Sequence, residues 1–326
     1  MDKKYDIAAI GECLIDFVPY KEQKEGKLTF SGCTGGAPPN MLACASQLGL
    51  ETALISKVGQ DVFGNLIKKT LGGCGIDIGA VKTSEEYSTT LAFVSLDETG
   101  DRSFSFYRTQ TADAMMVEAD IDMDVIRNAK VFHFGTVTMP MEPSRSTTLK
   151  AVQSAKENGC MISFDPNLRE FLWKDLAKAK EEILNAMPLA DVVKLSREEL
   201  TFLTGEENLE KGMNEMMGSY PIQLLVVTLD ADGSACMYKN GFAKQGTYVV
   251  DVVDTTGAGD AFWGAFLFQL ISRQIDVGNP QEQQITDALR FANAAGTLST
   301  TKYGGTASLP TFEEIEACMQ NGQLKK

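Results

Sequence analysis

A short segment in the last third of the chain combines a potential anion-binding turn with a potential base. It reads Asp254-Thr255-Thr256-Gly257-Ala258-Gly259-Asp260-Ala261-Phe262. The small residues Gly257, Ala258 and Gly259 allow backbone amides to approach a phosphate, and the apolar run over 261–271 predicts a buried helix that begins here. Free N–H groups and the helix dipole favour negative charge at such a start, and Asp260 is placed to take a proton from an attacking hydroxyl. The alternative is an ordinary helix start, where the dipole also favours Asp.

A second glycine-rich segment, Gly35-Gly36-Ala37-Pro38-Pro39-Asn40, precedes a small, apolar helical stretch. Gly35 and Gly36 allow a ligand to approach the backbone closely. The two prolines suit the first turn of a helix, and Asn40 would project an amide from that turn. The alternative is that Asn40 makes only a local backbone hydrogen bond.

Short apolar strands alternate with amphipathic helices along the chain. This alternation predicts an α/β fold in which helical crossovers join parallel strands and cover both faces of the sheet. The predicted core strands are 6–10, 53–58, 131–135, 161–165, 191–195 and 224–228, and the predicted helices are 37–48, 61–71, 144–158, 174–187 and 206–217. Ligands of such sheets bind at the carboxyl ends of strands, where Asp165 and Thr228 are expected.

Two regions break the alternation. Strand patterns over 91–97 and 102–107 flank the turn 97–101, and strand patterns over 14–20 and 28–31 flank the charged turn 21–27. They predict hairpins that could form a small sheet beside the main body. Two surface hairpins with no further role are the alternative.

Composition restricts the class of partner. The chain has 326 residues, 44% of them hydrophobic, and a formal net charge of −14 from 30 basic and 44 acidic residues. Without a basic cluster, a nucleic acid or an anionic membrane is an unexpected partner. Seven scattered cysteines, no signal peptide and no long apolar run indicate reduced thiols and a cytoplasmic protein.

Missing residues narrow the chemistry further. His133, the single histidine, lies in an apolar strand, so a structural role is expected for it and histidine triads and two-histidine zinc sites are excluded. The sequence contains neither Gly-x-x-x-x-Gly-Lys-Ser/Thr nor Gly-x-Gly-x-x-Gly, which argues against a P-loop kinase and a standard dinucleotide-binding enzyme.

The two glycine-rich segments together resemble the paired signatures of the ribokinase-like (PfkB) carbohydrate kinases. The resemblance covers nearly the whole chain. Within the family the sequence is most similar to the fructokinases, and the stretches that support this similarity are 9–16, 91–97, 104–108 and 164–169. It implies one domain over 1–326, a three-layer α/β/α sandwich with a mostly parallel central sheet, and a small β-sheet lid from about 12–34 and 88–110. The lid is often also a dimer contact in this family, so a homodimer is expected.

The implied activity is transfer of the γ-phosphoryl group of ATP to a fructose hydroxyl, with Asp260 as general base. Within the kinases, 2-keto-3-deoxygluconate kinase, which shares Asp-Pro-Asn-x-Arg, and ribokinase are the alternatives. From a different class, a sugar-sensing protein that has kept the fold but lost turnover is the alternative.

Sugar-binding residues are expected around both segments. Asp16 should end a strand, and its carboxylate can bind paired hydroxyls; Gly35, Gly36 and Asn40 resemble the sugar loop of the family. Arg169 offers a fixed fork of donors, although a surface Arg is the alternative. Further candidates are Asp165, which could instead cap the turn before Pro166, and Phe106 and Arg108, which could close from the lid.

The resemblance also suggests nucleotide and metal contacts. Thr228, Asp230 and Gly233 match the Thr-Leu-Gly-x-x-Gly loop of the family, with Asp230 in place of the usual Gly, and Asn293 lies in the adenine-side helix. Ser196 and Glu199 match an Asn-x-x-Glu motif of the family in which Ser replaces Asn, and Glu199 would contact Mg²⁺ through water. The alternative is that the two residues form a capping box at a helix start, which is compatible with the metal contact. Residues that match a monovalent-cation site, usually for K⁺, are Asp254, Thr256, Gly304 and Ser308.

Overall fold

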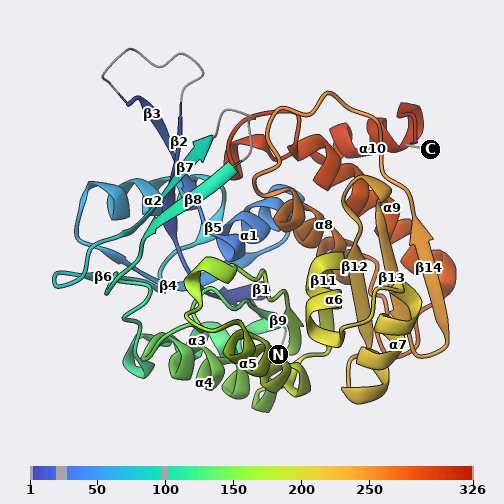
Figure 1. Ribbon diagram of the computed structural model, residues 1–326, viewed down its shortest axis with the longest axis horizontal. Helices are drawn as coiled ribbons and strands as arrows, with labels where there is room; N and C mark the ends of the chain where they lie inside the picture. The colour runs from blue at the N-terminus through green and yellow to red at the C-terminus, as the bar shows by residue number, and fades with distance from the viewer. Residues whose placement is uncertain (1–2, 20–27, 97–101, 325–326) are drawn as a thin grey trace.

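A mostly parallel sheet forms the centre of the molecule (Figure 1). The computed structural model describes residues 3–19, 28–96 and 102–324, and in this part of the chain ten strands form the sheet. Its order is β14-β13-β12-β11-β10-β9-β1-β4-β5, with β6 beside β4. The strands are β1 (Tyr5–Ile10), β4 (Thr52–Gly59), β5 (Ile76–Asp77), β6 (Val81–Ser84), β9 (Ala129–Phe134), β10 (Met161–Phe164), β11 (Val192–Ser196), β12 (Leu224–Thr228), β13 (Ser234–Tyr238) and β14 (Gly241–Gln245).

Both faces of this sheet are buried, because alternate residues of a strand point to opposite faces. In β1, Ile7 and Ala9 belong to one hydrophobic core, whereas Ala8 and Ile10 belong to the other. The first core is completed by α1 (Ala37–Gln47), α2 (Val62–Gly73), α8 (Ala258–Ser272), α9 (Glu282–Ser299) and α10 (Phe312–Asn321), and the second by α3 (Met123–Arg127), α4 (Ser144–Glu157), α5 (Leu176–Ala186), α6 (Arg197–Thr204) and α7 (Leu209–Ser219). The predicted three-layer α/β/α sandwich is confirmed.

All six predicted core strands are present and parallel to one another, and β12 is antiparallel to its other neighbour, β13. The antiparallel hairpin β13–β14 and the helix α10 are not among the predicted elements. The turn of this hairpin consists of Lys239 and Asn240, because Tyr238 pairs directly with Gly241.

A second, four-stranded sheet has the order β3-β2-β7-β8 in the described part of the chain. Its strands are β2 (Leu14–Pro19), β3 (Phe30–Gly35), β7 (Thr90–Leu96) and β8 (Arg102–Tyr107). The predicted strand 28–31 is therefore wrong in its bounds: β3 begins later and extends to Gly35, because Gly35 pairs with Leu14 and Cys33 pairs with Asp16. The turns predicted at 21–27 and 97–101 lie outside the described residues.

Aromatic packing holds this small sheet together. The rings of Phe17 and Phe93 stack with 4.7 Å between centroids, and the edges of Phe30 and Phe63 pack against Phe17. Phe63 belongs to α2, so the contact also attaches the small sheet to the main body. Figure 1 shows the sheet standing at one end of the molecule, beside α1 and α2.

Two further observations concern the helices. Among the described residues, no helix combines the length and the apolar character that crossing a membrane requires. The helix predicted after Asp260 is α8, and it is buried along most of its length, with Trp263 and Phe266 stacked inside the first core. It can therefore hold the residues at its start in a fixed position.

Candidate active site

The start of α8 has the geometry expected of an anion-binding turn. Gly257 is the N-cap and adopts a left-handed backbone with φ 78°, and its carbonyl accepts the N–H of Ala261 at 2.8 Å. A Cβ on Gly257 would lie 3.4 Å from the Cα of Gly305 and 3.5 Å from Nδ2 of Asn40, so the turn is closely packed as well as left-handed. The N–H of Ala258 donates to the carbonyl of Thr255 at 3.3 Å, which leaves it a weaker candidate donor for a ligand than the prediction assumes.

Asp260 lies in the first turn of α8 and is buried. Nδ2 of Asn40 donates to its Oδ2 at 2.9 Å, and Nδ2 of Asn167 donates to its Oδ1 at 3.1 Å. Burial raises the pKa of Asp260 to about 6, against the opposing effect of the hydrogen bond from Asn40. A carboxyl group with such a pKa is ionised at neutral pH and still basic enough to accept a proton.

A cavity of about 410 Å³ opens beside Asp260. The sequence-predicted residues Asp16, Gly36, Asn40, Phe106, Arg169, Gly257 and Gly259 line it with Asp260. The two glycine-rich segments, more than 200 positions apart in the chain, therefore meet in one site, and the hydrogen bond from Asn40 to Asp260 joins them. The alternative that Asn40 makes only a local backbone contact is wrong.

Asp16 reaches this cavity from a position that differs from the prediction. It lies within β2 and does not end the strand, and its partner on β3 is Cys33. Burial raises the pKa of Asp16 to about 7, and the positive charge of Arg169 opposes this shift. A Cβ on Gly35 would collide with the carboxylate of Asp16, so Gly35 does not line the cavity but makes room for Asp16.

Two other predicted sugar ligands do not line the cavity. The side chain of Arg108 is buried, and its Nε donates to Oδ2 of Asp113 at 2.9 Å. Asp165 follows the end of β10 as predicted, but its Oδ2 pairs with Nζ of Lys194 at 2.6 Å and its Oδ1 accepts the N–H of Asn167 at 3.2 Å. The turn-capping role considered for Asp165 is the one that the structure contains, together with an ion pair that the sequence did not suggest.

Several residues that line this cavity were not predicted as site residues: Glu12, Leu14, Ala37, Val137, Asn167, Lys194 and Thr255. Lys194 is buried in β11, and its Nζ lies 3.4 Å from the position that a Cβ on Gly259 would take. Burial disfavours its charge, but the carboxylates of Asp165 and Glu199 outweigh this effect and raise the pKa of Lys194. A lone lysine within the apolar run Val192-Val193-Lys194-Leu195 was the available signal.

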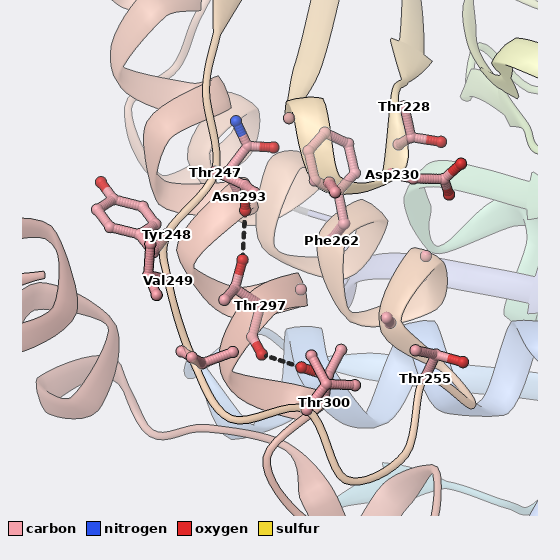
Figure 2. A pocket seen from close by; sticks show the side chains of 17 residues that line it. Thr228, Asp230, Thr247, Tyr248, Val249, Thr255, Phe262, Asn293, Thr297 and Thr300 are labelled. Atoms are coloured by element: carbon pink, nitrogen blue, oxygen red, sulfur yellow. Dashed lines mark hydrogen bonds between the residues drawn. The ribbon is translucent and has the colours of Figure 1, made fainter. Parts of the chain in front are cut away.

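A second cavity of about 660 Å³ lies on the other side of the start of α8. Figure 2 shows Thr228 and Asp230 on one side of Phe262, and Asn293 and Thr297 of α9 on the other. The predicted nucleotide residues Thr228, Asp230, Gly233 and Asn293 all line it. Nδ2 of Asn293 donates to the carbonyls of Gln245 and Gly246 at 3.1 Å each, which fixes the wall of the cavity after β14.

The two cavities share a boundary. Thr255 and Gly259 line both of them, and Asp260 follows directly. A ligand with phosphates in the larger cavity would therefore present its end to a ligand in the smaller cavity at the N-terminus of α8, where backbone N–H groups favour anions.

Ser196 and Glu199 are not among the residues that line either cavity. They form a capping box at the start of α6, in which Ser196 Oγ accepts the N–H of Glu199 at 3.1 Å and Glu199 Oε2 accepts the N–H of Ser196 at 2.7 Å. Glu199 Oε1 accepts the N–H of Leu168 at 2.7 Å. Contact of Glu199 with Mg²⁺ through water stays a prediction.

The residues that match a monovalent-cation site come together beside the α8 turn. The carboxylate of the buried Asp254 accepts the N–H of Thr256 at 2.9 Å and of Gly304 at 3.3 Å. Ser308 lies one turn further on, where its N–H donates to the carbonyl of Gly304 at 2.9 Å. Among the described residues, no group of three or more His, Cys, Asp or Glu is arranged to hold a metal ion.

His133 is buried in β9 and is not among the residues that line either cavity. Its Nδ1 lies 2.9 Å from Oγ of Ser163, which also accepts the indole N–H of Trp263 at 2.9 Å. Burial lowers the pKa of His133 to about 4. These contacts agree with the structural role expected for it.

Comparison with known proteins identifies the family. Residues 4–312 match the pfkB family carbohydrate kinase model. Fructokinase-1 of Oryza sativa subsp. japonica is 38% identical to this chain over 318 residues, which are 97% of this chain and 98% of that protein. The chain belongs to the pfkB family of carbohydrate kinases. The family resemblance in the two glycine-rich segments is thus confirmed, and the protein is a sugar kinase.

Solved structures agree with this assignment. Fructokinase from Xylella fastidiosa with bound ATP superposes on the kinase with a TM-score of 0.88 at 29% identity, covering 97% of this chain and 98% of that chain. A fructokinase double mutant from Vibrio cholerae O395, in a form with fructose, ADP and potassium ion bound, gives a TM-score of 0.86 at 34% identity, covering 97% and 99%.

Proposed function

We propose that this sugar kinase is a fructokinase in which Asp260 is the general base. The observation that carries the proposal is the position of Asp260, between a cavity lined by hydroxyl-binding groups and a larger cavity that reaches the same helix start. The fructokinase relative and the solved fructokinases with ATP or with fructose and ADP support the choice of substrate.

In the proposed reaction, fructose occupies the smaller cavity and ATP the larger one. The carboxylate of Asp260 accepts the proton of a fructose hydroxyl as its oxygen forms a bond to the γ-phosphorus. The bond between that phosphorus and the oxygen bridging to the β-phosphate breaks, and ADP leaves with the electron pair. The amides of Gly257 and Gly259 hold the transferring group, which is the main requirement of phosphoryl transfer.

Cations complete the proposed site. The only Lys and Arg among the residues lining the two cavities are Lys194 and Arg169, so they and the helix dipole carry the local positive charge. Mg²⁺ would accompany ATP and neutralise charge on its phosphates, held largely by phosphate oxygens and water. The buried carboxylate of Asp254, which lies beside Gly304, suits a weakly hydrated monovalent cation. K⁺ held there with Thr256, Gly304 and Ser308 would add positive charge beside the anion turn.

The small sheet is proposed to be a lid. Asp16 of β2 and Phe106 of β8 reach the sugar cavity from this sheet, and the ring of Phe106 packs 4.9 Å from Phe171 of the main body. We also propose that the sheet forms the contact in a homodimer. Light scattering over a range of concentrations tests the dimer, and a monomer at micromolar concentration contradicts it.

A coupled assay of ADP release with fructose, 2-keto-3-deoxygluconate and ribose tests the substrate. We expect the highest kcat/KM with fructose; a higher value with another sugar would overturn the assignment. 2-Keto-3-deoxygluconate is the second candidate, because Arg169 and Lys194 line the sugar cavity and could pair with a carboxylate. Saturable sugar binding without ADP release would instead indicate a sugar-sensing protein.

A further inference from the structure

The backbone turn after β10 is strained at Asn167. Its φ is 49°, a left-handed value that residues with a side chain adopt infrequently and that Asn tolerates better than most. Strain of this kind persists where the surrounding structure fixes the backbone, and it is concentrated at functional sites. The contacts around Asn167 therefore show what the turn is built to hold.

Neighbouring segments fix this turn on two sides. The carbonyl of Pro166 accepts the backbone N–H of Thr136 at 3.0 Å and its hydroxyl at 2.6 Å. On the other side, Oε1 of Glu199 accepts the N–H of Leu168 at 2.7 Å. The loop after β9 and the start of α6 thus hold the residues before and after Asn167.

Asp165 also fixes the turn, through its side chain. Its Oδ1 accepts the N–H of Asn167 at 3.2 Å, and its Oδ2 is held by Nζ of Lys194 at 2.6 Å. Both side chains of this ion pair are buried, so water does not compete for their hydrogen bond. The consequence is that the side chain of Asn167 is presented to the sugar cavity in one orientation.

That orientation places Nδ2 of Asn167 3.1 Å from Oδ1 of Asp260, while Nδ2 of Asn40 lies 2.9 Å from Oδ2. Each oxygen of the carboxylate thus accepts one amide hydrogen: Oδ1 from Asn167 in the turn after β10, and Oδ2 from Asn40 in α1. We propose that Asn167 is a positioning residue that fixes the carboxylate of Asp260 for proton transfer. The inference rests on the proposed function, in which Asp260 is the base.

The two amides suit this task physically. An amide N–H donates to a carboxylate without being able to take its proton or to titrate in the neutral range. With one lone pair of each oxygen engaged, rotation of the carboxylate is restricted, and each oxygen of this cavity-lining side chain keeps a second lone pair. A base held in this way meets the substrate hydroxyl without first having to reorient, which favours proton transfer.

The test compares Asn167→Ala with Asn167→Gly in the coupled ADP-release assay. Both variants lack the amide, but glycine adopts the left-handed backbone freely, so it controls for strain and for failure to fold. We expect kcat to fall by about 10- to 100-fold in both, the loss of one hydrogen bond to a charged group. The KM values for sugar and ATP should stay within about threefold. Wild-type kcat in Asn167→Gly would overturn the inference.

A double-mutant cycle separates positioning from a general structural effect. In an Asp260→Asn background there is no carboxylate base to position, so adding Asn167→Gly should leave the residual kcat within about twofold. A further loss of about tenfold in that background would show that Asn167 does not act through Asp260 and would contradict the inference. Full turnover by Asp260→Asn alone would instead overturn the proposed function, so the two failures are distinguishable.

Discussion

Lys194 and Asp165 form a buried ion pair beneath the sugar cavity, with 2.6 Å between Nζ and Oδ2 and no more than 7% exposure of either side chain. The pair joins β11 to the turn after β10. Removing one partner from such a pair leaves a buried charge without compensation, which costs more than removing both.

We therefore expect Lys194→Met to lower the free energy of unfolding by about 3–5 kcal/mol. The double variant Lys194→Met, Asp165→Asn should recover most of this loss, because no unpaired charge remains. Urea unfolding of the wild type, the single variant and the double variant at pH 7 measures the effect. Equal stability of the single and double variants would mean that the lysine charge is not what stabilises the aspartate.

Removal of the proposed base gives the second prediction. Asp260→Asn should lower kcat by about 10²–10⁴-fold and change sugar affinity only a few-fold, because the substituted amide keeps the size of the side chain but accepts no proton. Steady-state kinetics with calorimetric sugar binding would show this. Turnover within tenfold of wild type would remove Asp260 from the proposed role.

The raised pKa of Asp260 predicts a pH dependence. A base must be deprotonated, so kcat/KM for fructose should fall as the pH is lowered through about 6. Nearby charges also act on the pKa of Asp260: Asp165 raises it, whereas Lys194 and Arg169 lower it.

The pKa of Asp16 is raised to about 7, so its protonation should already weaken sugar binding between pH 7 and 6. Asp16→Asn should have a high KM that is nearly independent of pH, while the fall of kcat near pH 6 remains. Activity that stays constant down to pH 5 in wild-type enzyme would contradict the assignment of both carboxylates.

The α8 turn gives a prediction with a matched control. Gly257 has φ 78° and Gly49 has φ 100°, so alanine strains the backbone at either position. A Cβ on Gly49 meets nothing within 4 Å, whereas Gly257 lines the sugar cavity. Each alanine variant should lose roughly 1–2 kcal/mol of stability, but only Gly257→Ala should lose activity. Equal kcat in the two variants would show that the turn tolerates distortion.

The buried His133 gives a prediction about stability. Its pKa is about 4 in the folded protein and 6.5 in the unfolded chain, so lowering the pH below 6.5 protonates the unfolded state first. This contribution to stability is therefore complete at neutral pH and declines as the pH falls, by about 2 kcal/mol between pH 7 and pH 5. His133→Gln should lose that much less over the same interval in urea unfolding; an identical pH slope in both proteins would contradict it.

The sequence predicted well whatever depends on local pattern. Short apolar strands, amphipathic helices and the two glycine-rich turns are local features, and they are found close to their predicted positions, except for the strand predicted over 28–31. The meeting of Asn40 and Asp260 followed from the resemblance, because no periodicity relates residues so far apart. The hairpin β13–β14 was missed.

Side-chain partners were predicted less well, because they depend on packing between segments. Arg108 was expected at the sugar, but Asp113, five residues later, pairs with it inside the protein. Lys194 was overlooked because the sequence does not show that a lysine in an apolar strand has a buried partner, and that partner, Asp165, lies on the neighbouring segment. Asn167 was passed over because nothing local to Asp165-Pro166-Asn167 indicates a left-handed backbone directed at α8.

Gly36 alone connects β3 to α1, and its φ of 116° lies outside the range of most other residues. The strand before it belongs to the sheet that is proposed to close over the sugar, and the helix after it carries Asn40, which donates a hydrogen bond to the proposed base. If that sheet tilts when a ligand enters, a single residue separates the tilt from Asn40, so that enclosing the sugar and aligning the proton acceptor would be coupled.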